Sequence, residues 1–498
     1  MALRPVEPEV DPAPVAPVAS VAAPAGLART TPPRRADLVS VPTRDDVVAR
    51  SASEVIGGPA GRYAVRLARG WRYYAAALAG LSAVASTLAV VVRAPCVNAG
   101  WSSPDQFWHA CFSDVPATYR DADLGAGIGA YLQGGFGAPA PTQPPLTSFL
   151  MTLTATVVPG GPIEDRMRFY FSLWTIVAAV LLALTTWWTA ASVRRFPMRA
   201  ALVALSPVAA LTLLISPDIV GVALTAAALY AWSRDRPIVA GVLLGLAASA
   251  RTYPILVLLA MLLLCVRTGR VQVWVRTAGA ATLVFGGLLF VLGALNADAA
   301  SSAYRAWFDS GAGFGSPWVL PQLGNAPLSA TTVTVLAIAG WVLAVLAGAG
   351  FALATPRRPG LAEVSLVMVG IAMLTGKSLT VQSSLWLVPL VALVGLAWKD
   401  VLAWAAVEAL HFEAVWLYLA GTTTPSRGLP ASWYSVFLVL RLGGIIWVVA
   451  RTWQLARSRP PVRDDDGAVV ESAWGEEESD ELAGPLRDAP DQLVVRFS

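Results

Sequence analysis

Several apolar runs in this chain are long enough to cross a lipid bilayer as helices, and no other feature constrains the fold as strongly. Three examples are "YAAALAGLSAVASTLAVVV" (74–92), "FYFSLWTIVAAVLLALTTWWTA" (169–190) and "TAGAATLVFGGLLFVLGAL" (277–295). A spanning helix needs roughly 20 apolar residues. Only helices and closed barrels satisfy their backbone hydrogen bonds in lipid, and continuous apolar runs differ from the alternating strands of a barrel. The sequence therefore predicts an all-α polytopic membrane protein.

The composition agrees with this prediction. Of the 498 residues, 56% are hydrophobic and only 14% are charged. The mean hydropathy is +0.60. One soluble core does not need so much apolar sequence, so we expect most of it to face lipid.

The two ends of the chain differ from the middle. Residues 1–72 are rich in Ala, Pro and Arg and contain no early apolar stretch before a cleavage site. Such sequence cannot bury enough surface to become ordered, so we expect a disordered cytoplasmic arm and not a signal peptide. Residues 456–498 form an acidic tail, also expected in the cytoplasm. The membrane domain is expected between them, over 73–455.

Arginine clusters between the apolar runs predict the orientation. They lie at 194–199, 234–236, 267–276, 357–358 and 451–459. Positive residues favour the cytoplasmic side, so the sequence between two clusters crosses the membrane an even number of times. With one more inner turn at Lys399, the count is about 12 crossings, with both chain ends inside. The segment 144–158 does not fit this count. We expect a juxtamembrane or re-entrant helix there, and a thirteenth crossing is the alternative.

The same count of membrane crossings predicts that the polar segments that interrupt the apolar runs lie on the outer face. They are the loops 94–168 and 296–331 and the shorter breaks at 216–218, 250–254 and 375–382. The first loop contains "CFSDVPATYRDADL" (111–124), a concentration of charge in a chain with few charges. Because polar groups from several segments converge on this face, we expect the functional site there.

Asp114 is the candidate general base in the first outer loop. If Arg120, Arg251 or Lys377 lies beside it, its carboxylate stays ionised at neutral pH and accepts a proton. The alternative is a helix N-cap, since "SDVP" is a plausible helix start with Pro in the first turn.

Arg251 and Lys377 are the candidates to bind the phosphate of an anionic substrate. Arg251 lies at a helix break and Lys377 in a Gly/Ser/Thr loop. The charge that develops on a leaving phosphate needs such donors. For each residue the alternative is a helix-end side chain that extends toward the interface. Asp218, directly after a proline, is either a site residue or a plain N-cap.

Six segments, taken in order, resemble actinobacterial glycosyltransferase family 87. They are "CFSDVPATYRDADL", "QPPLTSFLM", the segment 213–259, "WFDSGAGFGSPW", "TGKSLTVQSSLWLVPL" and "WAAVEALHFEAVWLYLAG", within about 95–450. The resemblance implies a GT-C-type helical bundle and a polyprenyl-phosphate-mannose-dependent mannosyltransferase. It also implies that Asp114 is the catalytic base of an outer-face loop. The chain departs from the family pattern with Gln143-Pro144 and with Ser216-Pro217-Asp218.

On this basis we expect an inverting transfer. Asp114 would deprotonate an acceptor hydroxyl, which attacks the anomeric carbon of a polyprenyl-phosphate sugar while Arg251 and Lys377 hold the phosphate. Six residues are expected to position the substrates: Tyr119, Arg120, Asp218, Tyr253, Gln382 and His411. For His411, in "EALHFEAVW", the alternative is a buried structural histidine with a carboxylate partner.

Cys96 and Cys111 both lie in the first outer loop, where an oxidising compartment permits a disulfide; two free thiols are the alternative. There is no nucleotide-binding motif, and two histidines without ligand spacing predict no metal site. We therefore expect no cofactor. The expected partners are a polyprenyl-phosphate sugar donor, a glycolipid or polysaccharide acceptor and the lipid bilayer of the plasma membrane, and not a nucleic acid.

Two other functions remain open at this point. A sugar-lipid transporter or flippase would show related broken helices in two halves, with ionisable groups mid-membrane. The chain shows no internal repeat, and its charges are expected at one face. The second alternative is a non-catalytic scaffold for envelope assembly, in which the N-terminal arm and the acidic tail would take part. This function predicts that Asp114 is dispensable.

Overall fold

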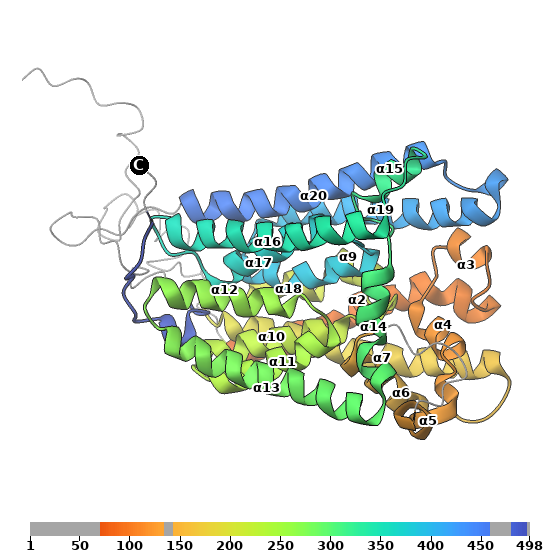
Figure 1. Ribbon diagram of the computed structural model, residues 1–498, viewed down its shortest axis with the longest axis horizontal. Helices are drawn as coiled ribbons and strands as arrows, with labels where there is room; N and C mark the ends of the chain where they lie inside the picture. The colour runs from red at the N-terminus through yellow and green to blue at the C-terminus, as the bar shows by residue number, and fades with distance from the viewer. Residues whose placement is uncertain (1–69, 134–142, 459–479, 496–498) are drawn as a thin grey trace, which may run out of the picture. The chain divides into compact units, whose positions relative to one another are not determined.

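The computed structural model describes residues 70–133, 143–458 and 480–495, and every structural statement below concerns these residues. All of their regular secondary structure is helical, as Figure 1 shows. The predicted all-α polytopic membrane fold is confirmed. Almost all of the arm expected at 1–72, and residues 459–479 of the tail, lie outside the described residues.

Six of the described helices are long and apolar enough to cross a membrane. They are α2 (Trp71–Ala99), α7 (Ile163–Ser192), α13 (Val271–Leu295), α16 (Ala330–Ala354), α19 (Trp398–Thr423) and α20 (Ala431–Ser458). Helix α2 packs against α7, and α19 packs against α20. On α13, Leu283 and Phe290 are three-quarters exposed. Such a surface is stable only against lipid, which is as apolar as the side chains themselves.

Shorter apolar helices complete the bundle. They are α8 (Ala201–Ala204), α9 (Pro207–Thr212), α10 (Ile219–Ser233), α11 (Pro237–Ala250), α12 (Pro254–Arg267), α17 (Leu361–Leu374) and α18 (Leu387–Val394), with the 3₁₀ helices η3 (Pro197–Ala200) and η4 (Val381–Trp386). At about 1.5 Å per residue, none of these α-helices alone reaches the roughly 30 Å of a hydrocarbon core. Helices α10, α17 and α18 are almost completely buried. The total of twelve crossings therefore stays a prediction.

The first predicted outer loop folds into a group of short helices at one end of the bundle. They are α3 (Asp105–Trp108), α4 (Asp114–Asp121), η2 (Leu124–Ala126), α5 (Gly127–Gln133) and α6 (Pro145–Ala155), and Figure 1 shows them at the right. The loop is shorter than predicted at both ends: α2 continues through Pro95 to Ala99, and α7 begins at Ile163. The 11 residues of α6 are too few to cross a bilayer.

The second predicted outer loop contains α14 (Ala297–Asp309) and α15 (Val319–Leu323). In Figure 1, α14 runs across the direction of the long bundle helices. Trp307 and Phe308 are exposed on it, as are the ion-paired side chains of Asp298 and Arg305. An amphipathic helix with exposed aromatic and charged residues suits the boundary between lipid and water.

The arginine clusters lie at the opposite end, together with residues 480–495 of the acidic tail. The Asp491 carboxylate lies 2.7 Å from Arg267 and 3.4 Å from Arg358, and all three side chains are buried. Leu482 and Leu486 join the hydrophobic core of the bundle. This part of the tail therefore belongs to the packed domain, and the predicted domain end at 455 is too early.

Candidate active site

Helix α4 presents Asp114 at its first position. The N-cap is Ser113: its Oγ accepts a hydrogen bond from the Val115 N–H at 3.3 Å and donates to the Leu214 carbonyl at 2.7 Å. The Asp114 N–H donates to the Ile215 carbonyl at 2.6 Å. The N-cap alternative for Asp114 is therefore wrong, because its neighbour fills that position and leaves the Asp114 carboxylate free for another role.

Two links fix the segment before α4. A disulfide joins Cys96, near the end of α2, to Cys111. Arg93, fully buried on α2, donates to the carbonyls of Ala110 at 3.1 Å and Leu211 at 2.8 Å. Arg93 had no predicted role, although a lone charge in an apolar run is a signal for a functional or structural role.

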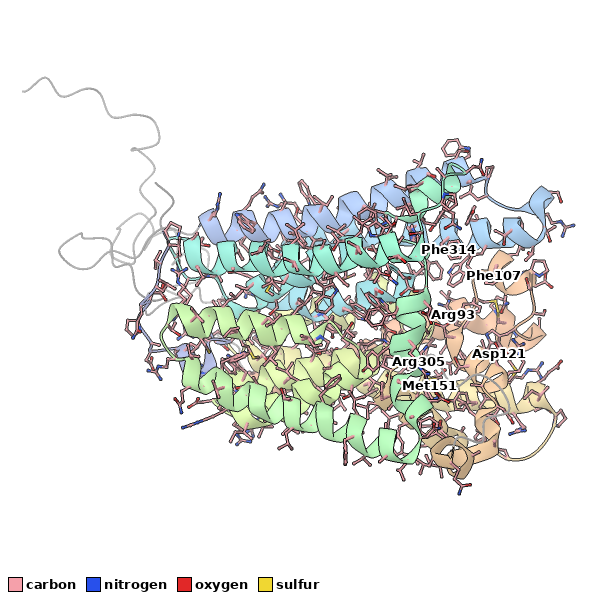
Figure 2. The ribbon with its side chains drawn as sticks, in the orientation of Figure 1. Arg93, Phe107, Asp121, Met151, Arg305 and Phe314 are labelled. Atoms are coloured by element: carbon pink, nitrogen blue, oxygen red, sulfur yellow. A yellow bond between two sulfur atoms is a disulfide. The ribbon has the colours of Figure 1, made fainter. Side chains whose placement is uncertain are left out.

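Asp114 lines a cavity of ≈ 270 Å³. The other lining residues are Phe112, Ile215, Gly313, Phe314, Ser378, Leu379, Thr380, Val381, Gln382, His411, Val415, Trp416 and Leu419. Figure 2 labels Phe314, Phe107 and Arg93 toward the same end of the bundle. The Gln382 amide donates to the Asp114 carboxylate at 3.4 Å. Asp114, Gln382 and His411, selected from three separate segments, thus line a single cavity.

The Asp114 carboxyl is partly buried and faces this cavity, not bulk water. Its burial raises its pKa to about 7; the charge of Asp218 adds to the increase, and that of Arg251 opposes it. The expectation of a fully ionised carboxylate at neutral pH is therefore wrong, since desolvation outweighs the nearby cation. A pKa near the working pH is favourable for a general base.

Asp218 and Arg251 form a buried ion pair close to Asp114. Arg251 Nη2 lies 2.5 Å from Asp218 Oδ1 and donates to Gln143 Oε1 at 3.0 Å. Asp218 also accepts hydrogen bonds from Ser216 Oγ and, at 2.6 Å, from Trp386 Nε1. Burial acts to raise the pKa of Asp218, but Arg251 and these donors together lower it. Asp218 occupies the N-cap position of α10, but its side chain makes no capping hydrogen bond there, so a plain N-cap role does not account for this carboxylate.

Tyr253 contacts this ion pair indirectly, through Trp386. Its ring stacks on Trp386 with a centroid distance of 4.8 Å, and its hydroxyl donates to the Gly221 carbonyl at 3.4 Å. Because Trp386 donates to Asp218, Tyr253 orients a partner of the ion pair. It is not among the residues that line the cavity.

Lys377 is buried, and its ammonium group is fully used by the backbone. Nζ donates to the carbonyls of Trp307, Phe308 and Ser310 at 2.7, 3.0 and 2.8 Å. A cation at the carboxyl end of a helix satisfies unpaired carbonyls and the helix dipole, and here that helix is α14. Lys377 does not line the Asp114 cavity. The structure therefore does not support the predicted phosphate contact of Lys377.

Tyr119 and Arg120, both on α4, also lie outside the cavity lining. The Tyr119 ring packs on Tyr170 at 4.6 Å, and its buried hydroxyl has no hydrogen-bond partner among the described residues. Arg120 is exposed and pairs with Asp121 at 2.7 Å. The structure does not bring these two residues to Asp114.

His411, on α19, is completely buried, and neither ring nitrogen has a hydrogen-bond partner among the described residues. The carboxylate partner of the structural alternative is absent there: Glu408 instead pairs with Arg441 at 2.9 Å and accepts from Trp404 Nε1 at 3.0 Å. Unpartnered buried polar groups are unfavourable. His411, which lines the cavity, is therefore suited to bind a polar ligand.

The sequence profile of glycosyltransferase family 87 matches residues 142–383. This part of the chain belongs to glycosyltransferase family 87. The resemblance found in the sequence is thereby confirmed, and the chain is a membrane glycosyltransferase that works beside a lipid bilayer. The family 87 match contains Asp218, Arg251 and Gln382, whereas Asp114 and His411 lie outside it. A comparison with curated proteins found no match.

Proposed function

We propose that this family 87 enzyme transfers a mannosyl residue from a polyprenyl-phosphate donor to a glycolipid or polysaccharide acceptor, with inversion at the anomeric carbon. One observation carries the proposal: Asp114 presents a partly buried carboxyl with a pKa of about 7 to a cavity of ≈ 270 Å³. Among described side chains it receives only one hydrogen bond, from Gln382. Such a group is available to accept a proton at neutral pH.

In the proposed reaction, Asp114 takes the proton of an acceptor hydroxyl. The hydroxyl oxygen forms a bond to the anomeric carbon, and the bond from that carbon to the phosphate oxygen breaks on the opposite face. The polyprenyl phosphate leaves with the electron pair, so the reaction needs neither a nucleotide nor a metal ion. Gln382 and His411 supply hydrogen bonds to sugar or acceptor hydroxyls, which fixes the direction of attack.

Arg251 is the residue we propose to stabilise the leaving phosphate. Arg251, like Lys377, does not line the cavity, but its positive charge acts on Asp114 and opposes the increase in the pKa of that carboxyl. The guanidinium is therefore within electrostatic range of the base. Asp218 would hold this guanidinium in place through their ion pair. Lys377 would influence the reaction only through α14.

We also propose that the cavity faces the outside of the plasma membrane, with both chain ends in the cytoplasm. The arginine clusters, which favour the cytoplasmic side, lie at the end of the bundle opposite to α3–α6 and α14. On the outer face a lipid-linked donor has its prenyl chain in the bilayer and its phosphate at the interface. This arrangement matches the apolar bundle below the cavity.

The proposal is tested with the purified full chain in lipid nanodiscs. Polyprenyl-phosphate-mannose is the donor, with polyprenyl-phosphate-glucose and a polyprenyl-phosphate pentose in parallel, and envelope glycolipids and polysaccharides are the acceptors. Mass and linkage analysis should find one added mannosyl unit of inverted configuration. Transfer from another donor alone would refute the mannosyl assignment.

Asp114→Asn should slow transfer at least about a hundredfold, since it removes the general base and keeps the size of the side chain. Asp121→Asn, at an exposed position on the same helix, is the matched control and should leave the rate unchanged. Near-normal turnover of Asp114→Asn would refute the role of this residue.

A further inference from the structure

Arg441 is a fully buried cation in the middle of α20. Its Nε donates to Glu408 on α19 at 2.9 Å. Its other two nitrogens donate to the Leu379 carbonyl at 2.5 Å, the Thr380 carbonyl at 2.8 Å and Ser384 Oγ at 2.9 Å. One side chain therefore ties the two long helices to the segment 379–384.

The segment that Arg441 holds is a wall of the active-site cavity. Residues 378–382 all line the cavity, and Gln382 donates to Asp114. The segment starts after α17 and enters the short η4, so its first carbonyls are not part of an α-helical hydrogen-bond ladder. Arg441 supplies donors to two of these carbonyls, which restricts the segment to one conformation.

A second wall of the cavity lies against the same guanidinium. Gly315 has φ +81°, and a Cβ there would lie 2.7 Å from Arg441 Nη1 and 1.9 Å from the Leu379 oxygen. The Gly315 N–H donates to the Tyr434 hydroxyl of α20 at 3.0 Å. The adjacent Phe314 lines the cavity. The loop around Gly315 thus packs directly on the contact between Arg441 and Leu379.

We propose that Arg441 is a positioning residue for glycosyl transfer: it holds 379–384 so that Gln382 contacts Asp114 and the cavity keeps its shape. The inference rests on the proposed role of Asp114 as the base. Arg441 does not line the cavity, so it acts through Gln382 and not on the substrate. Glu408 fixes the guanidinium in turn.

Only arginine satisfies all these contacts. Its planar fork reaches a carboxylate, two carbonyls and a hydroxyl at once, whereas lysine is a point charge with three donors. A buried ion pair in an apolar region is also a weak source of stability compared with well-packed apolar residues. We therefore interpret this pair as fixing the geometry of the cavity wall.

The test compares Arg441→Lys with Gln382→Leu in the nanodisc assay. Arg441→Lys should keep the charge and the fold but lower kcat about tenfold or more, with KM changed less than threefold. The acid limb of the kcat/KM profile should shift to higher pH in both variants, because a donor to the carboxylate favours its ionised form. The double variant should be no slower than the slower single variant, since both changes act on one contact.

Arg451→Lys is the matched control. Arg451 lies on the same helix and pairs with Asp400 of α19 at 3.4 Å, but neither residue lines the cavity. This variant should show the wild-type rate and pH profile. If Arg441→Lys does not fold, Ser384→Ala removes a single contact of the guanidinium and should give a several-fold loss of kcat with the same shift of the acid limb.

A purely structural ion pair gives a different result. In that case Arg441→Lys lowers the melting temperature but leaves the acid limb unchanged, and its effect on the rate multiplies with that of Gln382→Leu; this outcome overturns the inference. The underlying mechanism fails separately: if Asp114→Asn is active, the base assignment itself is wrong, whatever Arg441→Lys does.

Discussion

Asp114 and Asp218 lie close enough for their charges to interact, yet their surroundings shift the pKa values of the two carboxylates in opposite directions. Asp218 accepts hydrogen bonds from Arg251, Ser216 and Trp386, and its pKa is lowered. Asp114 receives one long side-chain contact, from Gln382, and its pKa is raised to about 7. When the surroundings of two carboxylates move their pKa values apart, the two groups are suited to different roles in the reaction. The paired carboxylate is suited to hold a cation, and the poorly solvated one to exchange a proton.

The local structure explains the difference. Ser113 caps α4, so no backbone N–H of that helix is bonded to the Asp114 carboxylate. Asp218 precedes α10 without capping it and turns toward Arg251 and Trp386. The first two predictions below test this contrast, and the third tests the role of Lys377; they follow in order of the expected size of the effect.

Asp218→Asn should destabilise the protein by about 3 kcal/mol, because it leaves the buried Arg251 guanidinium without its counter-ion. The stability that Asp218 provides is present above its unfolded pKa of about 4 and is lost as the pH falls through its lower folded value. Thermal unfolding, followed by tryptophan fluorescence at pH 8, measures the change.

Asp114→Asn is the contrasting variant in the same experiment. The folded pKa of Asp114 exceeds the unfolded value, so ionisation of this carboxyl lowers the stability progressively between about pH 4 and pH 7, and the full cost is present above pH 7. The variant should therefore unfold at the same temperature as the wild type, or a higher one, at pH 8. If both variants were equally destabilised, the contrast between the two regions would be wrong.

The pH profile of the wild type provides the second prediction. If ionised Asp114 is the base, kcat/KM should rise through pH 7 and fall about tenfold for each pH unit below it. Initial rates between pH 5 and pH 9, at donor and acceptor concentrations well below KM, measure this limb. A limb near pH 4 would mean that Asp114 is solvated like an ordinary carboxylate, and the contrast with Asp218 would disappear.

Lys377→Met should have the smallest effect, less than tenfold on kcat. The side chain binds the carbonyls at the end of α14, and the loop that carries it also carries the cavity wall from Ser378 onward. Removing a direct donor to the leaving phosphate would instead cost roughly 2–4 kcal/mol. Transfer rates at saturating donor distinguish the helix-end role from a direct phosphate contact. A hundredfold loss of kcat would mean that Lys377 binds the phosphate.

The sequence predicted the parts of the site that depend on local patterns. The motif around Asp114, the break at Arg251 and the segment with Gln382 were each selected from their own residues. It could not predict that Lys377 binds the end of α14, because the two are separated by about 70 positions and the pairing depends on how α14 crosses the bundle. Arg441 was not predicted for the same reason: the sequence around a single arginine in an apolar run does not show which distant carbonyls it binds.

By itself, the sequence determined the membrane fold, because hydrophobicity adds up residue by residue along each helix and lipid imposes the length. It also determined the family, through motifs whose order along the chain needs no coordinates. Only the tertiary structure decided which carboxylate is free and which cation is already bound. Those answers depend on distances of a few ångströms between distant segments, such as Gln382 to Asp114 and Arg251 to Asp218. Desolvation and Coulomb interactions change steeply over such distances, so a pattern of residue types does not fix them.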